Sequence, residues 1–172
     1  MSTFKKFKDQ TLAKVYAKIP ALLDLYAQRA DLVVNDAAPL TSLPGPLRTC
    51  RVALVTTAGM HLTQQEPFDM TDKKGDPSYR EIPSSIGIEE LTITHDYFPK
   101  ADALADPNLV LPIEPLRRLV REGTVGSISP RFFSFMGHIL GEHLKTLTRT
   151  TALEVAAALK ADGVDAVFLT PV

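Results

Sequence analysis

One stretch of the sequence decides the fold: Leu159-Lys-Ala-Asp-Gly-Val-Asp-Ala-Val-Phe-Leu-Thr-Pro-Val172. It has the pattern of a helix end, a glycine cap at Gly163 and a short apolar strand over about Ala166 to Thr170. A parallel sheet covers such apolar runs on both faces, so we expect this strand to be buried. In open α/β sheets, ligands and reactive groups lie just beyond the carboxyl ends of such strands. The stretch therefore predicts an α/β domain with a functional edge after Thr170.

A second convincing strand is Arg51-Val-Ala-Leu-Val-Thr56, which is followed by the small residues of Thr57-Ala-Gly-Met-His61. A β-branched run that leads into small residues and glycine is typical of the first strand of an α/β sheet. Residue patterns predict further strands over 90–94 and 125–129, and helices over 113–122 and 150–160. Together they predict a single domain with a mostly parallel open sheet flanked by helices.

The N-terminal part has a different character. Apolar side chains recur at helical spacing through residues 4–32, with Pro20 marking a kink, so residues 1–36 are expected to form a helical arm. Residues 37–48 have the proline density of a linker. The α/β domain is then expected to occupy residues 49–172.

Composition excludes several classes of protein. The net charge is −1, which gives no basic field for nucleic acid or an anionic membrane surface. No apolar run approaches the roughly 18 residues of a membrane span, and the N-terminus lacks the apolar core of a signal peptide. Cys50 is the one cysteine, so the 172 residues hold no internal disulfide and no Cys-x-x-Cys, and Cys50 is expected to be a buried structural thiol. These features predict a cytoplasmic protein.

Two segments have the character of functional loops. Residues 62–90 are polar and rich in proline and glycine, and so long an irregular stretch is uncommon in a compact domain unless it binds something. Within it, Arg80 has a planar fork that could grip a carboxylate, or could equally tie the loop to the body. His95 and Asp96 follow a predicted strand and could shuttle a proton, although a loop histidine bonded to a backbone carbonyl is the simpler reading.

Other kinds of site have little support. The four histidines show no i, i+4 pair and accompany no cysteine cluster, so no metal site is expected; His138 and Glu142 are read as an exposed polar pair. Thr56-Thr-Ala-Gly59 resembles a small backbone nest but lacks the glycine spacing of nucleotide-binding loops. No serine lies in a Gly-x-Ser-x-Gly motif. The residues alone therefore indicate two binding loops without a nucleophile.

Several motifs in order resemble one known family, the selenoprotein B family. It includes the component B subunits of glycine, sarcosine and betaine reductases and the selenocysteine subunit of D-proline reductase. The resemblance runs from about residue 49 to the end of the sequence. It rests on Arg51-Val-Ala-Leu-Val-Thr-Thr-Ala-Gly59, Gly75-Asp-x-Ser-Tyr-Arg-x-Ile-Pro83, Thr94-His-Asp96, Ala103-x-x-Asp-Pro-Asn108, Gly126, Ser134-Phe-Met-Gly137 and Ala161-Asp-Gly-Val-Asp-Ala-Val-x-Leu-Thr170.

The resemblance implies a redox motif, Sec-x-x-Cys or Cys-x-x-Cys, that would begin directly after Val172. Because UGA encodes selenocysteine, we expect a reading frame cut short at an in-frame UGA and a chain that is inactive alone. The implied selenolate attacks the α-carbon of a small amino-acid substrate held as an imine on a pyruvoyl group of a partner subunit. A selenide-sulfide would then be reset by a dithiol donor protein.

The resemblance also implies roles for particular residues. Ser78, Tyr79 and Arg80 would form a pocket wall, with Arg80 facing a substrate carboxylate. Thr57 and Gly59 would contact substrate, and His95 and Asp96 would move a proton. Residues 97–100 depart from the family pattern, which leaves the substrate open. Two alternatives to the reductase subunit remain, a non-catalytic assembly module and a thiol-disulfide reductase of other substrates, and a homo-oligomer is compatible with each.

Overall fold

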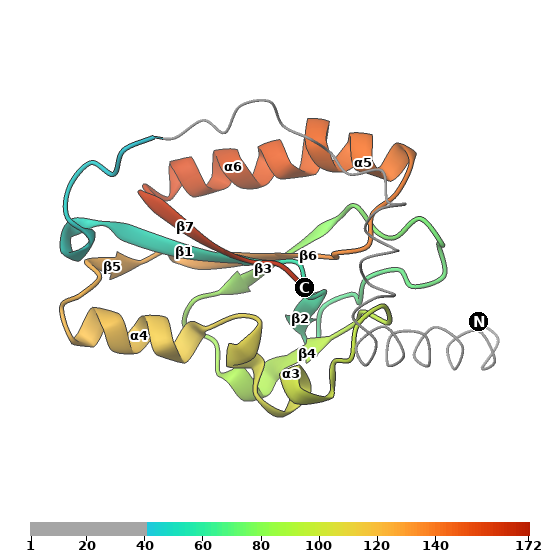
Figure 1. The fold of residues 1–172 in the computed structure, drawn as a ribbon, viewed down its shortest axis with the longest axis horizontal. Helices are drawn as coiled ribbons and strands as arrows, with labels where there is room; N and C mark the ends of the chain where they lie inside the picture. The colour runs from blue at the N-terminus through green and yellow to red at the C-terminus, as the bar shows by residue number, and fades with distance from the viewer. Residues whose placement is uncertain (1–40) are drawn as a thin grey trace, which may run out of the picture. The chain divides into compact units, whose positions relative to one another are not determined.

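A central mixed sheet forms the core of the protein. The computed structural model describes residues 41–172. β1 (Arg51–Thr56) pairs in parallel with β5 (Ser127–Ile128) near its start, with β6 (Arg131–Phe135) near its end and with β7 (Ala166–Thr170) along its length. β3 (Tyr79–Pro83) adds antiparallel to β6. Within residues 41–172, β3, β7 and the two-residue β5 each have a single strand neighbour in this sheet. The sheet confirms the predicted mostly parallel α/β class (Figure 1).

Helices cover both faces of this sheet. α5 (Glu142–Thr146) and α6 (Ala152–Ala161), joined by a π-helix over Leu147–Thr151, lie on one face (Figure 1). On the other face lie α3 (Ala101–Ala105), α4 (Ile113–Arg121) and the small antiparallel pair of β2 (Met60–Leu62) and β4 (Leu91–Ile93). Single 3-10 turns occupy Leu47–Thr49, Ile88–Glu90 and Pro107–Leu109. No helix within residues 41–172 has the length and apolar character to cross a membrane.

The core is apolar and centred on β1 and β6. Ala53, Phe132 and Phe133 are fully buried, and Leu54 is nearly so. Cys50 is also fully buried, as expected of a structural thiol. The helices predicted over 113–122 and 150–160 and the strand over 90–94 are confirmed, with bounds that differ by one or two residues.

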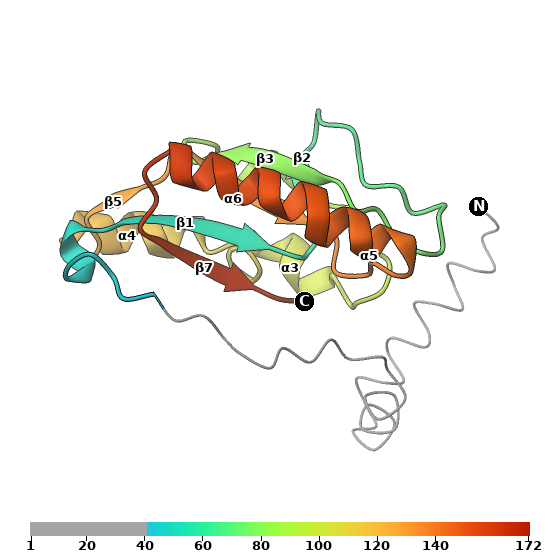
Figure 2. The ribbon, with the colours of Figure 1, turned by 90° about the horizontal axis from the view of Figure 1, so that it is seen from above.

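Two sequence-based expectations are wrong. The first is burial of the last strand: Val167, Phe168 and Leu169 are 40%, 55% and 67% exposed. β7 has β1 as its one strand neighbour among the described residues, and α6 crosses over the middle of the sheet and leaves β7 to one side (Figure 2). The apolar run therefore marks an exposed edge strand. The sequence pattern of an edge strand and of a central strand is the same when the edge is apolar.

The second is the irregular stretch over residues 62–90. It contains the strand β3, in which Ile82 is the one fully buried side chain. A strand with a single buried residue has no clear alternation of apolar and polar side chains, so its pattern is weak.

The main body of the described chain comprises Leu43–His95 and Lys100–Val172. Residues 41–42 and 96–99 group outside this body. The predicted helical arm over 1–36 and the first part of the linker over 37–48 lie outside the described residues, so the domain boundary at residue 49 stays a prediction.

Candidate functional site

Three connections meet at the carboxyl edge of the sheet. The amide of Gly59, after β1, donates to the carbonyl of Phe135 at 2.8 Å, and the amide of Thr94, after β4, donates to the carbonyl of Gly59 at 2.9 Å. The amide of Gly137, after β6, donates to Nε2 of His95 at 3.3 Å. We call Thr57, Gly59, His95, Gly137 and Val172 the junction. It lies where α/β proteins place ligands.

Two glycines allow this close approach. Gly59 has a φ of +66°, and a Cβ there would lie 2.6 Å from the carbonyl oxygen of Thr94 and 3.1 Å from Cβ of His95. A Cβ on Gly137 would lie 2.8 Å from the Val172 carbonyl oxygen, 3.2 Å from that of Thr57 and 3.3 Å from Nε2 of His95. The small residues that follow β1 and β6 are therefore required by packing at the junction.

His95 is buried at the junction, whereas Gly137 and Val172 are exposed, so the junction reaches the surface beside the histidine. Nε2 of His95 accepts a hydrogen bond from the Gly137 backbone amide, so this nitrogen acts as an acceptor in this geometry. Nε2 of His95 has a backbone amide as its partner, and the hydrogen bond to a backbone carbonyl that the sequence suggested stays a prediction. Asp96 groups outside the main body, so its pairing with His95 stays a prediction.

Threonine hydroxyls fasten the end of β7 to its neighbours. The hydroxyl of Thr57 accepts a hydrogen bond from the amide of Val172 at 3.0 Å, and the amide of Thr57 donates to the carbonyl of Thr170 at 3.2 Å. The hydroxyl of Thr170 donates to the carbonyl of Val110 at 2.6 Å. Thr57 therefore holds the main chain at the point where β7 ends.

Arg80 is engaged by its own loop. Its guanidinium donates to the carbonyl oxygens of Glu66 and Pro67 at 2.7 and 3.0 Å and to the hydroxyl of Ser78 at 2.8 Å. It also lies over the ring of Phe68, with Cζ 4.3 Å from the ring centroid. Of the two roles left open by the sequence, these contacts favour tying the loop to the body.

The three residues predicted to form one wall do not share a face. Successive residues of a strand point to opposite faces of the sheet, so Tyr79 and Arg80 point apart. Tyr79 packs against Phe133 and Phe135, with ring centroids 5.8 and 5.9 Å away. Burial of its ring, with the charge of Glu154, raises the pKa of Tyr79. The structure thus brings Thr57, Gly59 and His95 together and separates Tyr79 from Arg80.

His61 is a residue that sequence reasoning considered as a metal ligand only. The structure buries it to 3% exposure, with Nδ1 2.7 Å from the carbonyl of Leu62 and Nε2 2.8 Å from the hydroxyl of Thr94. Within residues 41–172 no group of three or more potential ligands could hold a metal ion. One sequence signal could have identified His61 as a residue near the site: it comes directly after the small residues that follow β1.

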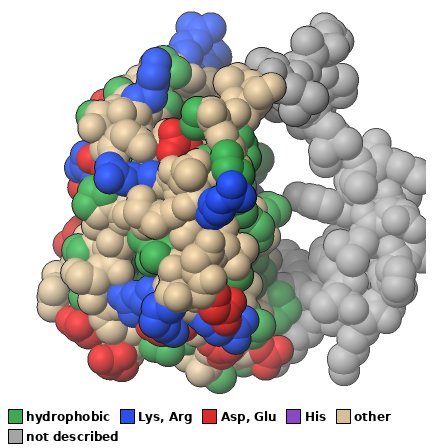
Figure 3. All heavy atoms as spheres, turned by 90° about the vertical axis from the view of Figure 1, so that its left-hand side faces the viewer, with side chains coloured by type: hydrophobic (Ala, Val, Ile, Leu, Met, Phe, Trp, Pro, Cys, Tyr) green, Lys and Arg blue, Asp and Glu red, His purple; other side chains and the backbone are tan. Residues whose placement is uncertain are grey.

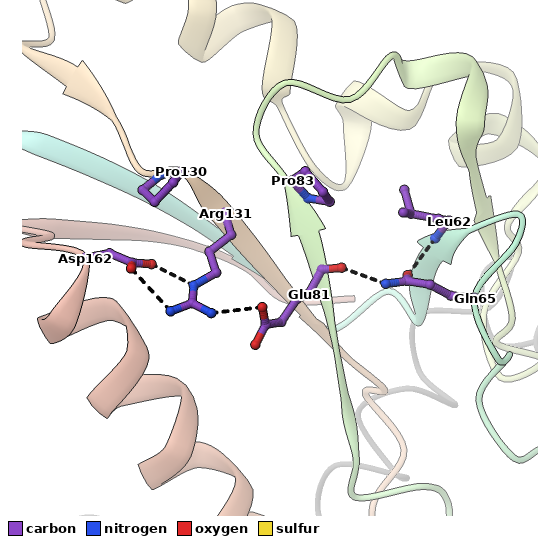
Figure 4. Close-up of a pocket in the computed structure, with 7 residues that line it drawn as sticks. All are labelled: Leu62, Gln65, Glu81, Pro83, Pro130, Arg131 and Asp162. Atoms are coloured by element: carbon purple, nitrogen blue, oxygen red, sulfur yellow. Dashed lines mark hydrogen bonds and ion pairs between the residues drawn. The ribbon is translucent and has the colours of Figure 1, made fainter.

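A pocket of about 440 Å³ lies along the edge of β3, near the start of β6 (Figure 4). Within it, Arg131 bridges Glu81 on β3 at 2.9 Å and Asp162 after α6 at 2.8 Å. Hydrogen bonds from Arg131 to Asp162 and to Glu81 raise the pKa of the guanidinium. The pocket is lined by Leu62, Gln65, Glu81, Pro83, Pro130, Arg131 and Asp162. Its charged groups are paired with one another, as in a structural ion network.

The side of the molecule seen in Figure 3 carries charges of both signs. Lys and Arg side chains are interspersed there with Asp and Glu side chains, and neither the positive nor the negative side chains form a large patch on the face shown. This is the pattern expected from a net charge of −1. The junction lies at the carboxyl ends of the parallel strands, where α/β proteins place ligands, and this position makes it the stronger candidate for the functional site.

A protein-family model, described as glycine/sarcosine/betaine reductase selenoprotein B, matches residues 28–172. The chain belongs to this family. D-proline reductase subunit gamma of Acetoanaerobium sticklandii is 35% identical over 130 residues, which cover 76% of this chain and 52% of the relative. Betaine reductase complex component B subunit beta of Peptoclostridium acidaminophilum is 31% identical over 144 residues, which cover 80% of this chain and 30% of the relative.

A sarcosine reductase complex component B subunit beta of the same organism is 28% identical over 111 residues. The chain thus spans about half or less of the length of these curated relatives. No solved structure matches the chain. Family membership confirms the resemblance that the motifs predicted.

Proposed function

We propose that this chain is the α/β part of a reductase subunit that cleaves the C–N bond of glycine, a glycine derivative or D-proline. The relatives are named as subunits of D-proline, betaine and sarcosine reductases, and this supports the reaction class. The proposal extends to a pyruvoyl-bearing subunit and a dithiol donor protein as partners. The proposed location is the cytoplasm, where dithiol donors stay reduced.

One observation carries the proposal. Thr57, Gly59 and His95, which the motifs singled out separately, meet beside Val172 at the end of β7. We propose, in keeping with the resemblance, that the redox motif follows this position directly. The residues that would handle substrate and the proposed position of the nucleophile therefore share one edge of the sheet.

The described residues hold the backbone of Val172 in place. Its amide donates to the hydroxyl of Thr57, and its carbonyl lies beside Gly137, which has no side chain. A selenocysteine or cysteine after Val172 would supply the nucleophile, and a pyruvoyl group on a partner subunit would supply the electrophile that holds the substrate.

The residues of the chain would perform three tasks. Thr57 fixes the main chain through its bond to the Val172 amide, which limits the positions that a following side chain can reach. Gly137 keeps the space beside this backbone clear of a side chain. His95, which is buried, would take up a proton from water at Nε2 in place of its amide hydrogen bond and then donate that proton to the amine that departs during reductive cleavage.

The test begins with the gene. We expect TGA after the codon for Val172, followed in frame by two codons, a cysteine codon and further open frame; TAA or TAG would contradict the proposal.

The full frame, produced with selenocysteine insertion and combined with its partners, should release amine from D-proline, glycine, sarcosine or betaine in the presence of dithiol. His95→Gln should lower kcat at least tenfold, as expected for loss of a general acid or base, while Cys50→Ala serves as the matched control away from the junction. Dithiol-dependent cleavage by the 172-residue chain alone would also contradict the proposal.

The exposed β7 supports a second candidate, an assembly module. Its side chains Val167, Phe168 and Leu169 form an apolar edge, and apolar strand edges recruit further strands. A stable complex of the 172-residue chain with the other reductase subunits, formed without any amine release, would favour this candidate. A chain that reduces generic disulfides but no amino acid would favour the thiol-disulfide reductase.

A further inference from the structure

His61 is a buried titratable group that the proposed mechanism does not use. It lies on β2, is 3% exposed and contacts Phe68 edge-on, with ring centroids 6.3 Å apart. Burying a histidine without function has a cost unless both ring nitrogens are satisfied. Both nitrogens of His61 have partners, and one of these partners is the residue before His95.

The two hydrogen bonds fix the tautomer of His61. The carbonyl of Leu62, 2.7 Å from Nδ1, can only accept, so Nδ1 carries the hydrogen. Nε2 then has a lone pair and accepts from the hydroxyl of Thr94 at 2.8 Å. The Thr94 hydroxyl therefore has one orientation, donating to His61.

Thr94 connects this bond to the junction. Its amide donates to the carbonyl of Gly59 at 2.9 Å, and its own carbonyl lies where a Cβ on Gly59 would collide with it. The side chain of Thr94 is thus held by His61 and its backbone by Gly59. The next residue in the chain is His95, whose Nε2 accepts from Gly137.

We infer that His61 is a positioning residue, which acts through the Thr94 hydroxyl to hold His95 in register with Gly137 beside Val172. The inference rests on the proposed function only for the role of His95 in proton transfer. The hydrogen bonds themselves are independent of any reaction. The spacing of these residues in the sequence does not reveal the arrangement, because His61 lies on β2 and Thr94 follows β4.

The environment keeps His61 in the form that this role needs. Burial lowers the pKa of His61, its bond to Leu62 works in the opposite direction, and the charge of Arg80 lowers it further. Lys100, whose ammonium donates to the carbonyl of Ile93 at 3.4 Å, adds a second positive charge near β4. A neutral ring retains an acceptor at Nε2. A protonated ring would have two donors and no acceptor for the Thr94 hydroxyl.

The test uses NMR of the 172-residue chain. Long-range ¹H–¹⁵N spectra report the tautomer of each histidine, and amide exchange reports the bond from Gly137 to His95. In wild type we expect hydrogen on Nδ1 of both His61 and His95 and a protected Gly137 amide. Thr94→Val removes the hydroxyl at nearly constant volume and should speed exchange of the Gly137 amide about tenfold, the equivalent of one hydrogen bond.

Matched variants separate positioning from general loosening. Thr94→Ser keeps the hydroxyl and should retain wild-type exchange at Gly137, and His61→Gln, which can accept from Thr94, should lie between wild type and Thr94→Val. The amide of Val52, at the opposite end of β1, should be unchanged in all variants. Unchanged Gly137 exchange and an unchanged His95 tautomer in folded Thr94→Val would overturn the inference. The NMR readout needs no reductase activity, so failure of the proposed reaction would not affect this result. Failure of the inference would likewise leave the proposed reaction untouched.

Discussion

The edge strands β3 and β7 are stabilised in different ways. On β3, the amide side chain of Gln65 donates to the backbone carbonyl of Glu81 at 2.8 Å, and Arg80 is fastened to the preceding loop. On β7, the edge presents the exposed side chains of Val167, Phe168 and Leu169. The polar fastenings of β7 are concentrated near its two ends, where Asp165 accepts from the amide of Arg51 and the threonines bond at the junction.

We call the β3 edge closed, because the chain's own loop covers it, and the β7 edge open, because its apolar side chains are exposed. Proteins blunt exposed edges with charge, proline or a covering segment, and β3 has such a cover in its own loop. β7 carries no charged residue between Ala166 and Thr170. The junction, with its proposed chemistry, lies at the end of the open strand, so changes to β3 should affect stability and changes to β7 should affect the junction and association.

The largest effect is expected at Arg80, on the closed edge. Arg80→Ala removes charged hydrogen bonds to two carbonyl oxygens and the stacking on Phe68, so the free energy of unfolding should fall by about 2 to 3 kcal/mol. Arg80→Lys retains the charge without the fork and should lose part of this amount. Urea denaturation measures both. Arg118→Ala, whose side chain is 66% exposed, is the control and should change stability by less than about 0.5 kcal/mol.

In a complete reductase, Arg80→Lys also tests the role that the sequence left open. A loop-anchoring arginine predicts lost stability with the KM for amino-acid substrates unchanged. A KM raised at least tenfold with stability unchanged would show instead that Arg80 binds the substrate carboxylate.

The second effect is expected at Thr170, where β7 is fastened. Thr170→Val leaves the carbonyl of the buried Val110 without its donor, which should cost about 1 to 2 kcal/mol of stability. Thr170→Ser should retain most of it. Thr148→Val removes an exposed hydroxyl that bonds within its own helix and should be close to neutral. Equal losses for Thr170→Val and Thr148→Val would show that the hydroxyls do not fasten β7.

The contrast between the edges also shows what the sequence could predict. Strand β1 and helices α4 and α6 are visible in the sequence because apolar periodicity reports burial, and these elements are buried on at least one face. β3 was missed because it buries one side chain and is held by polar partners outside the strand, Gln65 and Arg131, both of which contact Glu81. The strand β7 was predicted, but its exposure was not. The composition of a strand does not reveal whether it has a neighbour on each side.

The site was predictable in part for the same reason. Thr57, Gly59 and His95 each follow a strand, and the structure brings them together at the junction, while their roles stay predictions. The partnership of His61 with Thr94 depends on the register of β2 and β4, which a single sequence does not determine. The separation of Tyr79 from Arg80 follows from alternation along β3, and it was hidden because β3 was taken for a loop.

A third, pH-dependent effect is expected in the loop that covers β3. Burial of the Asp76 carboxyl opposes its ionisation, but hydrogen bonds from Ser78 and from the Asp69 amide, with the charge of Arg80, hold the pKa of Asp76 below its ordinary value. The stabilisation is therefore complete above the unfolded-state pKa of about 3.9 and is lost as the pH falls through the lower folded-state value. Asp76→Asn should be less stable than wild type at pH 6, and the difference should shrink toward pH 2.5 in denaturation experiments. A constant difference would mean that the charge of Asp76 contributes nothing.

The smallest effect on stability, and the most selective one on association, is expected at Leu169 on the open edge. Leu169 is 67% exposed, so Leu169→Lys should change the free energy of unfolding by less than about 0.5 kcal/mol. A lysine at an apolar strand edge opposes pairing with another strand, so the variant should be monomeric at concentrations where the wild-type 172-residue chain self-associates in light scattering. Leu153→Lys, on α6 and 59% exposed, is the matched control, because it adds the same charge away from the strand edge. If both variants reduce association equally, net charge is the cause. If only Leu169→Lys does, association proceeds through the edge of β7, the strand that ends at the junction, and whatever pairs with that edge is brought beside His95.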